Sequence, residues 1–215
     1  MIDLSIVIVS YNTRDFLYEC IKSVYKNSKD FSFEVIIFDN ASKDGSSTMV
    51  KEKFKDVILV TNKTNLGFSK ANNLGVKKTK GRYLLFLNAD TIVYPKTLKT
   101  LIDFMDKNKS VGASTCKLEL PNGGIDDASH RGFPTPWNAF CHFTGLEKFL
   151  GKTKIFGGYN LGFMDLNKTH EIDALAGAFM MVRREAGEDA GWWDEDYFFY
   201  GEDIDFCYML KQKGW

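Results

Sequence analysis

The sequence predicts an α/β fold with a doubly wound, mostly parallel sheet and helices on both faces. Two observations lead to this prediction. Four short apolar runs alternate with stretches of helical periodicity in the first 110 residues, a spacing typical of βαβ units with right-handed crossovers. Each run also stops at polar residues. These residues would gather at the carboxyl edge of the sheet, where open α/β folds bind their ligands.

Composition indicates an ordinary globular protein. The chain has 215 residues, of which 44% are hydrophobic, and its 28 basic residues equal its 28 acidic ones, so no overall charge attracts nucleic acid. The apolar runs are too short to span a bilayer and Asp3 disfavours a signal peptide, so we expect a cytoplasmic protein. Four scattered cysteines without a C-x-x-C pair argue against disulfides and a zinc site.

The first two predicted strands are Leu4 to Val9 and Glu34 to Phe38. The first ends at Ser10-Tyr11-Asn12, and apolar residues at helical spacing follow it from Phe16 to Tyr25. The second ends at Asp39-Asn40, before a turn and a short helix. An acidic residue at this position can accept a bond from a ribose hydroxyl or a base N–H, although it can equally start a turn.

Two more strands are predicted at Val57 to Val60 and Tyr83 to Leu87. A helix from Asn65-Leu66-Gly67-Phe68 to about Lys78 lies between them, and its free N–H groups would favour a diphosphate, or would simply form a capping turn. After Leu87 come Asn88 and Asp90, and Asp90 is a suitable oxygen ligand for a divalent cation or the start of a turn. If the winding reverses before the Tyr83 strand, Ser10 to Asn12 and Asn88 to Asp90 face each other.

Regularity falls after Val111. We expect a strand at Thr115 to Leu120 and then an irregular excursion from Pro121 to Tyr159, of the kind that forms lids or binding loops. A strand is expected at Asp173 to Val182, followed by a brief helix and a last helix toward Lys213. Gly214 has the character of a helix C-cap, so we expect further sequence beyond it.

Glu202 and Asp203 precede this last helix and follow an aromatic segment, Trp192 to Tyr200. The two carboxylates are candidates for acid–base chemistry or for helix capping. We expect the aromatic side chains in the core rather than in a sugar-stacking platform. Neither the G-x-G-x-x-G fingerprint nor the P-loop is present, which argues against a Rossmann dehydrogenase and a P-loop enzyme.

Five motifs in order, at residues 7–12, 39–46, 65–68, 87–91 and 201–206, resemble family 2 glycosyltransferases, in particular their rhamnosyltransferase-like branch. The resemblance implies the GT-A fold, a nucleotide-diphosphate sugar donor, Mg2+ or Mn2+, and inversion at the anomeric carbon. It implies one domain over residues 1–215, with a nucleotide-sugar-binding half at 1–110 and an acceptor-side, catalytic half at 111–215.

The resemblance also assigns roles to single residues. Asp203 matches the family's catalytic base and stands beside Glu202, while Asp90 matches the last aspartate of the D-x-D metal signature. Asn88 replaces the first aspartate of that signature, so metal binding would depend on Asp90 and the diphosphate. The implied nucleotide-sugar-binding residues are Ser10, Tyr11, Asn12, Asp39, Asn40, Asn65, Gly67, Asn72, Asn73, Asn88, Ala89 and Asp90.

The activity implied by this resemblance is sugar transfer from dTDP-rhamnose or a UDP-sugar to a polysaccharide or lipid-linked saccharide. Such an acceptor would place the protein peripherally at the inner membrane surface. Two other interpretations remain open: a non-catalytic module that binds nucleotide sugars or glycans, and a nucleotidyltransferase. The latter would carry a glycine-rich basic loop after the first strand, where this chain has Tyr11-Asn12-Thr13-Arg14.

Overall fold

The computed structural model describes residues 2–215 and divides into two compact units. The first unit joins residues 2–115 to residues 177–215, and the second is the segment 116–176. This division differs from a boundary at residue 110, because the strand β8 (Phe179–Arg183) pairs with β4 (Tyr83–Leu87). Residues 177–215 therefore belong with residues 2–115.

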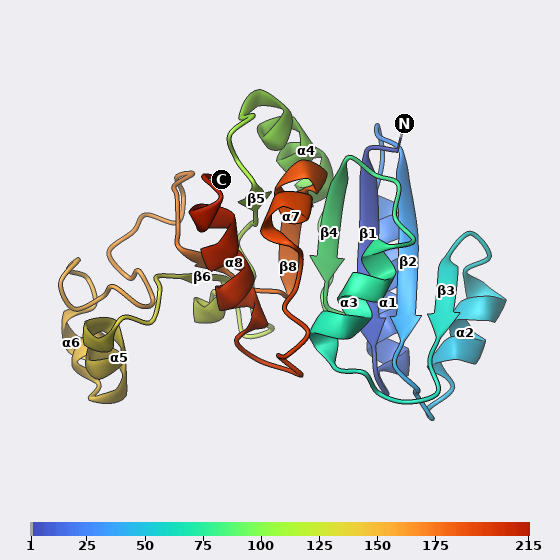
Figure 1. The fold of residues 1–215 in the computed structure, drawn as a ribbon, viewed down its shortest axis with the longest axis horizontal. Coiled ribbons are helices and arrows are strands. Elements are labelled where there is room, and N and C mark those ends of the chain that lie inside the picture. The colour runs from blue at the N-terminus through green and yellow to red at the C-terminus, as the bar shows by residue number, and fades with distance from the viewer. Residues whose placement is uncertain (1) are drawn as a thin grey trace. The chain divides into compact units, whose positions relative to one another are not determined.

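The first unit is built on a six-stranded sheet with the order β3-β2-β1-β4-β8-β5 (Figure 1). Its four parallel strands are β1 (Leu4–Ser10), β2 (Phe33–Asp39), β3 (Ile58–Thr61) and β4. Because β1 pairs with β2 on one side and β4 on the other, the winding reverses between β3 and β4. The carboxyl ends of β1 and β4 thus meet at one edge, as predicted.

Helices cover both faces of this sheet, with α1 (Arg14–Asn27) and α3 (Phe68–Val76) on opposite faces (Figure 1). Right-handed crossovers that move outward to β3 and then return to β4 require this placement. α3 lies so close to β1 that a Cβ added at Gly75 would be 2.6 Å from Val7 Cγ1. The remaining helices of this unit are α2 (Ser46–Lys53), α4 (Thr97–Lys107), α7 (Arg184–Ala190) and α8 (Glu202–Gln212).

The core of the first unit consists of the central strands and the helix faces against them. All five residues of β4 are buried, as its unbroken apolar run predicts for a strand covered on both faces. On α1, the predicted apolar face buries Leu17, Cys20, Ile21 and Val24. Burying one such aliphatic side chain contributes about 1.5 to 3 kcal/mol, so this core fixes the sheet whose edge carries the candidate residues.

The far side of the sheet differs from the prediction. β8 and β5 (Ala113–Ser114) are antiparallel to their neighbours, so the sheet is mainly parallel with an antiparallel side. The strand expected at 115–120 is wrong, since only an isolated bridge between Glu119 and Ile125 forms there. The strand expected at 173–182 is broken around Gly177 and Ala178, because backbone groups of both residues bond to other segments.

The second unit contains helices that the sequence analysis missed. α5 (Pro136–Phe143) and α6 (Leu146–Leu150) lie in the stretch expected to be irregular, and that expectation is wrong for both. The start of α5 does carry a sequence signal, because the Thr135 side chain caps it and proline is its first residue. A two-stranded sheet of β6 (His130–Arg131) and β7 (Ala174–Leu175) completes this unit.

Among residues 2–215, no helix combines the length and the apolar character needed to cross a membrane.

Candidate functional site

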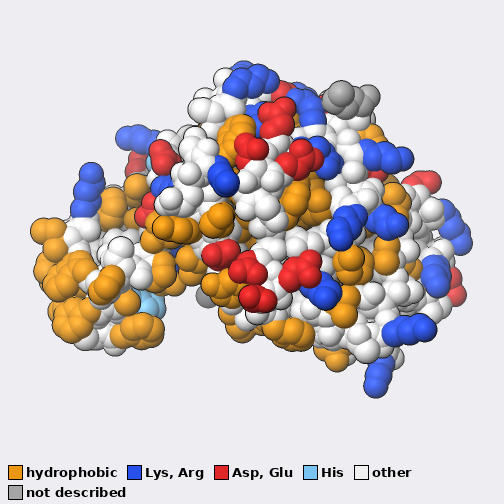
Figure 2. Space-filling view, viewed as in Figure 1, with side chains coloured by type: hydrophobic (Ala, Val, Ile, Leu, Met, Phe, Trp, Pro, Cys, Tyr) orange, Lys and Arg blue, Asp and Glu red, His pale blue; other side chains and the backbone are white. Residues whose placement is uncertain are grey.

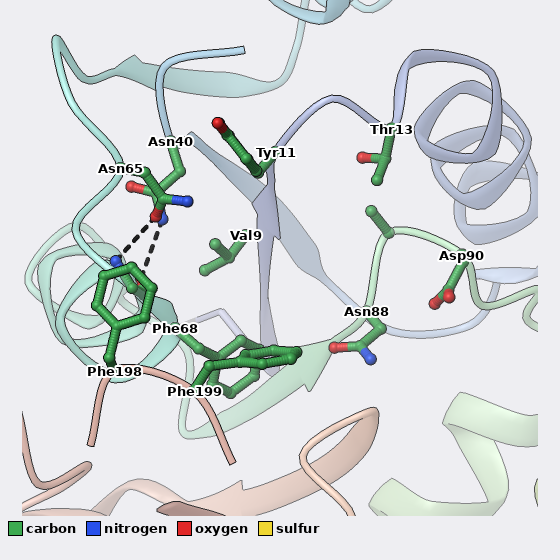
Figure 3. Close-up of a pocket in the computed structure, with 12 residues that line it drawn as sticks. Val9, Tyr11, Thr13, Asn40, Asn65, Phe68, Asn88, Asp90, Phe198 and Phe199 are labelled. Atoms are coloured by element: carbon green, nitrogen blue, oxygen red, sulfur yellow. Dashed lines mark hydrogen bonds between the residues drawn. The ribbon is translucent and has the colours of Figure 1, made fainter.

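A pocket of about 350 Å³ opens at the carboxyl ends of β1 and β4, within the range of small-molecule sites (Figure 3). Asn40 and Asn65 stand at one end of it, Asn88 and Asp90 at the other, and Tyr11 lies between them (Figure 3). Seven predicted site residues line it: Tyr11, Asn40, Asn65, Gly67, Asn88, Ala89 and Asp90. The structure therefore brings together motifs that are far apart in the sequence.

The loop after β1 is fastened to the loop after β2. Asn12 has a left-handed backbone, with φ of 54°, and its N–H donates to Ser42 Oγ at 2.9 Å. Its side-chain oxygen accepts the Lys43 N–H at 2.8 Å. Asn12 thus holds the rim of the pocket, while its neighbour Tyr11 is half exposed and lines it.

Asn40 is buried and organises the segment before α3. Its Nδ2 donates to the Gly67 carbonyl at 2.9 Å, and its Oδ1 accepts the Leu66 N–H at 3.1 Å. An amide is suited to this task because it donates and accepts at the same time. Asn40 therefore ties the end of β2 to the segment that carries Asn65 and Gly67.

Ser10 and Asp39 are buried at the ends of β1 and β2. Ser10 Oγ lies 2.9 Å from Thr13 Oγ1, and Thr13 lines the pocket. One carboxylate oxygen of Asp39 accepts from Ser47 Oγ at 2.7 Å, whereas the other has no hydrogen-bond partner within residues 2–215. Buried carboxylate oxygens are usually satisfied, so this oxygen is a spare acceptor next to the site, while Asp39 itself is not among the residues that line the pocket.

The start of α3 differs from the sequence-based expectation. The N–H groups of Leu66, Gly67 and Phe68 already donate, to Asn40 Oδ1, Asn65 Oδ1 and the Phe198 carbonyl. The prediction that free N–H groups there receive a diphosphate is therefore wrong for these three. Two of these N–H groups are taken by the asparagine side chains of the same site, and the third by the segment at Phe198. That segment approaches closely, since a Cβ on Gly67, whose φ is +81°, would lie 2.6 Å from the Phe198 carbonyl oxygen.

Asn72 and Asn73 on α3 have hydrogen-bond partners within the fold. Asn72 Nδ2 donates to the Phe68 carbonyl at 3.1 Å. Asn73 Nδ2 donates to the Trp193 carbonyl at 2.8 Å, and its Oδ1 accepts the Trp193 N–H at 3.2 Å. These contacts fasten the Trp193 segment to α3, and a role of either asparagine toward a donor sugar stays a prediction.

The Asn88–Asp90 turn is held by the backbone of the β8 side. The Asn88 N–H donates to the Ala178 carbonyl at 2.9 Å, and the Asn88 carbonyl accepts from Cys20 Sγ at 3.6 Å. Burial and the negative charge of Asp90 raise the pKa of the Cys20 thiol to about 12. Asp90 itself is exposed, so its carboxylate is available to a ligand at this end of the pocket.

Asp203 is joined to the same sheet edge. Its Oδ2 accepts the Gly177 N–H at 3.3 Å, and the next residue along the chain, Ala178, is the one that binds Asn88. Asp203 lies in the first turn of α8, beside the buried Glu202. On the same turn, burial and the charge of Asp194 raise the pKa of Asp205. The carboxylates predicted from separate motifs thus belong to one edge of one unit.

Comparison with known proteins identifies the family. The sequence model described as glycosyl transferase family 2 matches residues 5–189. The chain belongs to glycosyltransferase family 2. Its recognition from five short motifs is confirmed.

Among curated proteins, this glycosyltransferase chain is similar to the rhamnosyltransferase WbbL of Escherichia coli K12. The two are 27% identical over 221 residues, which cover 97% of this chain and 77% of WbbL. An uncharacterized glycosyltransferase of Methanocaldococcus jannaschii, MJ1057, is 33% identical over 113 residues, or 50% of this chain. The match covers 39% of MJ1057, so this chain spans well under half of that relative.

Solved structures resemble the chain in fold. TarS of S. aureus in complex with UDP-GlcNAc superposes with a TM-score of 0.66 and 18% identity, over 99% of this chain and 54% of TarS 1-349. The mannosyltransferase PcManGT of Pyrobaculum calidifontis, in complex with GDP-Man and Mn2+, has a TM-score of 0.63 and 18% identity, over 95% and 50% of the two chains. The GT-A fold is confirmed by these neighbours.

The donor set of this family 2 chain fits a cation that is shared with a bound phosphate. No group of three or more His, Cys, Asp or Glu side chains in the described part of the chain could hold a metal alone. Magnesium-type ions are commonly bound by one or two carboxylates together with substrate phosphates and water. Asp90, an exposed residue that lines the pocket, supplies such a carboxylate.

Sequence reasoning missed several residues that line the pocket: Val9, Thr13, Phe68, Phe198 and Phe199. Phe198 and Phe199 were expected in the core, yet they are 60% and 55% exposed. The expectation holds for Trp193, which is buried against Phe86 and Phe206. The signal for exposure was the preceding acidic run, Asp194-Glu195-Asp196, which favours a solvated loop.

Proposed function

We propose that this chain transfers a sugar from a nucleotide-diphosphate donor to a saccharide acceptor, with inversion at the anomeric carbon. One observation carries the proposal. A single pocket has an amide-rich end at Asn40 and Asn65 and a carboxylate end at Asp90, and Asp203 is bonded to the same edge through the 177–178 backbone. Membership of glycosyltransferase family 2 supports it.

The amide-rich end would receive the nucleotide. Tyr11 offers an exposed ring for stacking on a base, and the unpartnered oxygen of Asp39 offers an acceptor for a base N–H or ribose hydroxyl. Ser10, Asn12 and Asn40 would shape this end of the site through their hydrogen bonds to Thr13, Ser42 and Gly67. The donor sugar would then lie toward Asn88 and Asp90.

A divalent cation, Mg2+ or Mn2+, would be held by Asp90 together with the donor diphosphate. When bound it would neutralise the charge that develops on the leaving diphosphate, an effect of several kcal/mol. The solved complexes of PcManGT and GalNAc-T7, which contain Mn2+, support a divalent ion. With Asn88 in place of a second carboxylate, we expect cation binding to depend strongly on the nucleotide.

Asp203 would act as the general base. Its carboxylate takes the proton of an acceptor hydroxyl while the hydroxyl oxygen bonds to the anomeric carbon, and the bond to the diphosphate oxygen breaks on the opposite face. General bases of this kind contribute about 10² to 10⁴ in rate. The Gly177 N–H bond orients the carboxylate, and Glu202 lies buried beside it.

We propose dTDP-rhamnose or a UDP-sugar as the donor, and a polysaccharide or lipid-linked saccharide as the acceptor. The similarity to WbbL, a rhamnosyltransferase, supports the first donor, and the complex of TarS with UDP-GlcNAc supports the second. Similarity to GgaB of Bacillus subtilis, a minor teichoic acid biosynthesis protein, supports a cell-surface polymer as acceptor. The protein would then work in the cytoplasm, at the inner membrane face.

A thermal-shift screen followed by a product assay tests this function. A ligand that binds only the folded state raises its melting temperature, so a dTDP- or UDP-sugar should do so, more strongly with Mn2+. Incubation with donor and saccharide should release nucleoside diphosphate. Saturable binding without product would instead favour a non-catalytic module, and no shift with any nucleotide sugar would contradict the proposal.

A further inference from the structure

The helices of the second unit expose large apolar side chains that form what we call the aromatic patch. Hydrophobic side chains gather over α5 and α6 in the space-filling view (Figure 2). Its members are exposed to these fractions: Trp137 48%, Phe140 51%, Phe143 86%, Phe149 88%, Leu150 42% and Ile155 65%. Scattered apolar residues are normal on a surface, but a cluster of this kind marks an interaction site.

Contacts within the second unit hold part of the aromatic patch in place. Trp137, Phe140 and Phe143 recur every third residue and so share one side of α5. The Trp137 and Phe140 rings stack, with centroids 5.7 Å apart. Trp137 Nε1 donates to the Ile155 carbonyl at 2.7 Å, which fastens the segment after α6 to α5. These contacts keep the apolar side chains together on one side.

The orientation of α6 is the reverse of an ordinary surface helix. It buries the carboxylate of Glu147 and exposes the ring of Phe149. Glu147 is satisfied inside the unit, because it accepts the Asn160 N–H at 2.7 Å and pairs with His142 Nδ1 at 2.9 Å. A helix that turns its polar group inward and its aromatic ring outward is adapted to an apolar surrounding.

The charged side chains near the aromatic patch in the sequence indicate what kind of surface it contacts. Between residues 136 and 156 the exposed charged side chains are Lys148, Lys152 and Lys154, since the one acidic residue, Glu147, is buried. Two copies of the chain joined through this surface would bring like charges together, which disfavours a symmetric dimer. In this segment the exposed aromatic rings are accompanied by exposed basic side chains and by no exposed acidic one, a combination typical of segments that lie in the interface of an anionic bilayer.

We propose that the aromatic patch docks this chain on an anionic membrane. Phe143 and Phe149 enter the boundary between headgroups and acyl chains, Trp137 lies at headgroup level, and the three lysines face lipid phosphates. The inference deepens the membrane-face part of the proposed function and rests on it for its biological role. Vesicle binding itself requires neither a nucleotide nor turnover, so the two can fail separately.

Flotation with lipid vesicles tests the docking surface. The protein should float with vesicles that contain phosphatidylglycerol and much less with phosphatidylcholine alone. F143S/F149S should lower the partition coefficient at least ~10-fold, from the lost burial of two rings. K148Q/K152Q/K154Q should lower it by about fivefold per lysine, and added salt should mimic this loss.

Matched controls carry the same substitutions elsewhere. F16S removes a ring that is 65% exposed on α1, and K51Q/K53Q/K55Q removes three exposed lysines around the end of α2; both should float like the wild type. Melting temperature and UDP binding should be unchanged in every variant. Equal flotation of F143S/F149S and wild type would overturn the proposal. So would light scattering that shows a wild-type dimer which F143S/F149S dissociates, since a second copy would then cover the patch.

Discussion

Aromatic side chains in the sheet core of the first unit and on the helices of the second unit are placed in opposite ways. In the first unit, Phe86 and Phe179 are buried in the sheet core, and Trp193 packs edge-on against Phe86. In the second unit, Phe143 and Phe149 are the most exposed of the large hydrophobic side chains that the structure describes. The sheet core of the first unit therefore uses aromatic residues to fix a sheet edge, whereas the helices of the second unit expose them.

The two units also use side-chain hydrogen bonds for different purposes. The pocket edge of the first unit is polar, and asparagines fasten it: Asn12, Asn40 and Asn73 each bond to another segment of backbone. In the second unit, hydrogen bonds from Asn160 to Glu147 hold a carboxylate in the interior of the unit. In the first unit, the hydrogen bonds of asparagines position the edge of the pocket. In the second unit, the hydrogen bonds of Glu147 keep its charge buried while the aromatic side of the helix faces outward.

The largest effect should come from the proposed base in the first unit. We expect Asp203→Asn to lower kcat by about 10² to 10⁴, because the amide cannot take a proton, while the nucleotide Kd stays near the wild-type value. Steady-state kinetics and calorimetry on the same sample measure both. Asp56→Asn, an exposed aspartate before β3, is the control. Full turnover by Asp203→Asn would remove Asp203 from this role.

A pair of phenylalanines tests the contrast directly. Phe179→Ala, at a residue 2% exposed in β8, should lower the free energy of unfolding by about 3 to 5 kcal/mol. Phe149→Ala, at 88% exposure in α6, should change it by no more than about 0.5 kcal/mol. Urea denaturation measures both values. A large loss for Phe149→Ala would mean that the aromatic patch is part of the fold's own stability.

The same contrast explains what the sequence could predict. Buried strands such as Tyr83–Leu87 can be recognised in the sequence as unbroken apolar runs. The position of the polar residues after them, at one edge of the sheet, follows from the parallel topology. α6 could not be found in this way, since it is five residues long and exposes Phe149 while burying Glu147. Apolar periodicity predicts helices that pack on a core, and this helix does not.

The candidate site was predictable in its residues and less so in their contacts. Asn88, Ala89 and Asp90 line the pocket, and their binding roles stay predictions. The bond from the Phe68 N–H to the Phe198 carbonyl joins residues 130 positions apart, and no local pattern encodes it. The sequence likewise predicts a continuous strand through Gly177, because the bond from its N–H to Asp203 is also a contact between distant residues.

Two glycines with positive φ, Gly67 in the first unit and Gly145 in the second, should differ in how well they tolerate a side chain. Gly67→Ala should cost about 1 to 3 kcal/mol of unfolding free energy, because its φ of +81° and ψ of 179° are accessible mainly to glycine. The added Cβ would also press on the Phe198 carbonyl oxygen. Gly145→Ala, in the second unit, has a φ of +78° but nothing within 4 Å, so it should cost less. Urea denaturation that ranks them equally would contradict the tight contact at the pocket.

A smaller and pH-dependent effect on stability is expected from the pair of Arg82 and Asp106 in the first unit. A hydrogen bond from Arg82 lowers the pKa of Asp106 from 3.8 to about 2. A lowered folded-state pKa adds stability above the unfolded pKa, and that stability is lost as pH falls from about 4 to about 2. Because the carboxylate is partly exposed, Asp106→Asn should cost only about 1 kcal/mol at pH 7.

Thermal unfolding at several pH values measures this loss. The difference between wild type and Asp106→Asn should vanish at the acid end of that range. Asp103→Asn, whose partner Lys99 is on the same helix surface, should cost less than about 0.5 kcal/mol. A difference between wild type and Asp106→Asn that persists undiminished in acid would show that charge at Asp106 is not its source.

We propose that a cation beside Asp90 and a nucleotide sugar share the pocket at the ends of β1 and β4. Calorimetry of UDP- and dTDP-sugar binding, with Mn2+ and with a chelator, tests it on wild type and Asp90→Ala. We expect Mn2+ to tighten binding to the wild type and to have little effect on Asp90→Ala, whose affinity should equal that of the chelated wild type. Equally tight, Mn2+-dependent binding by both proteins would contradict the account.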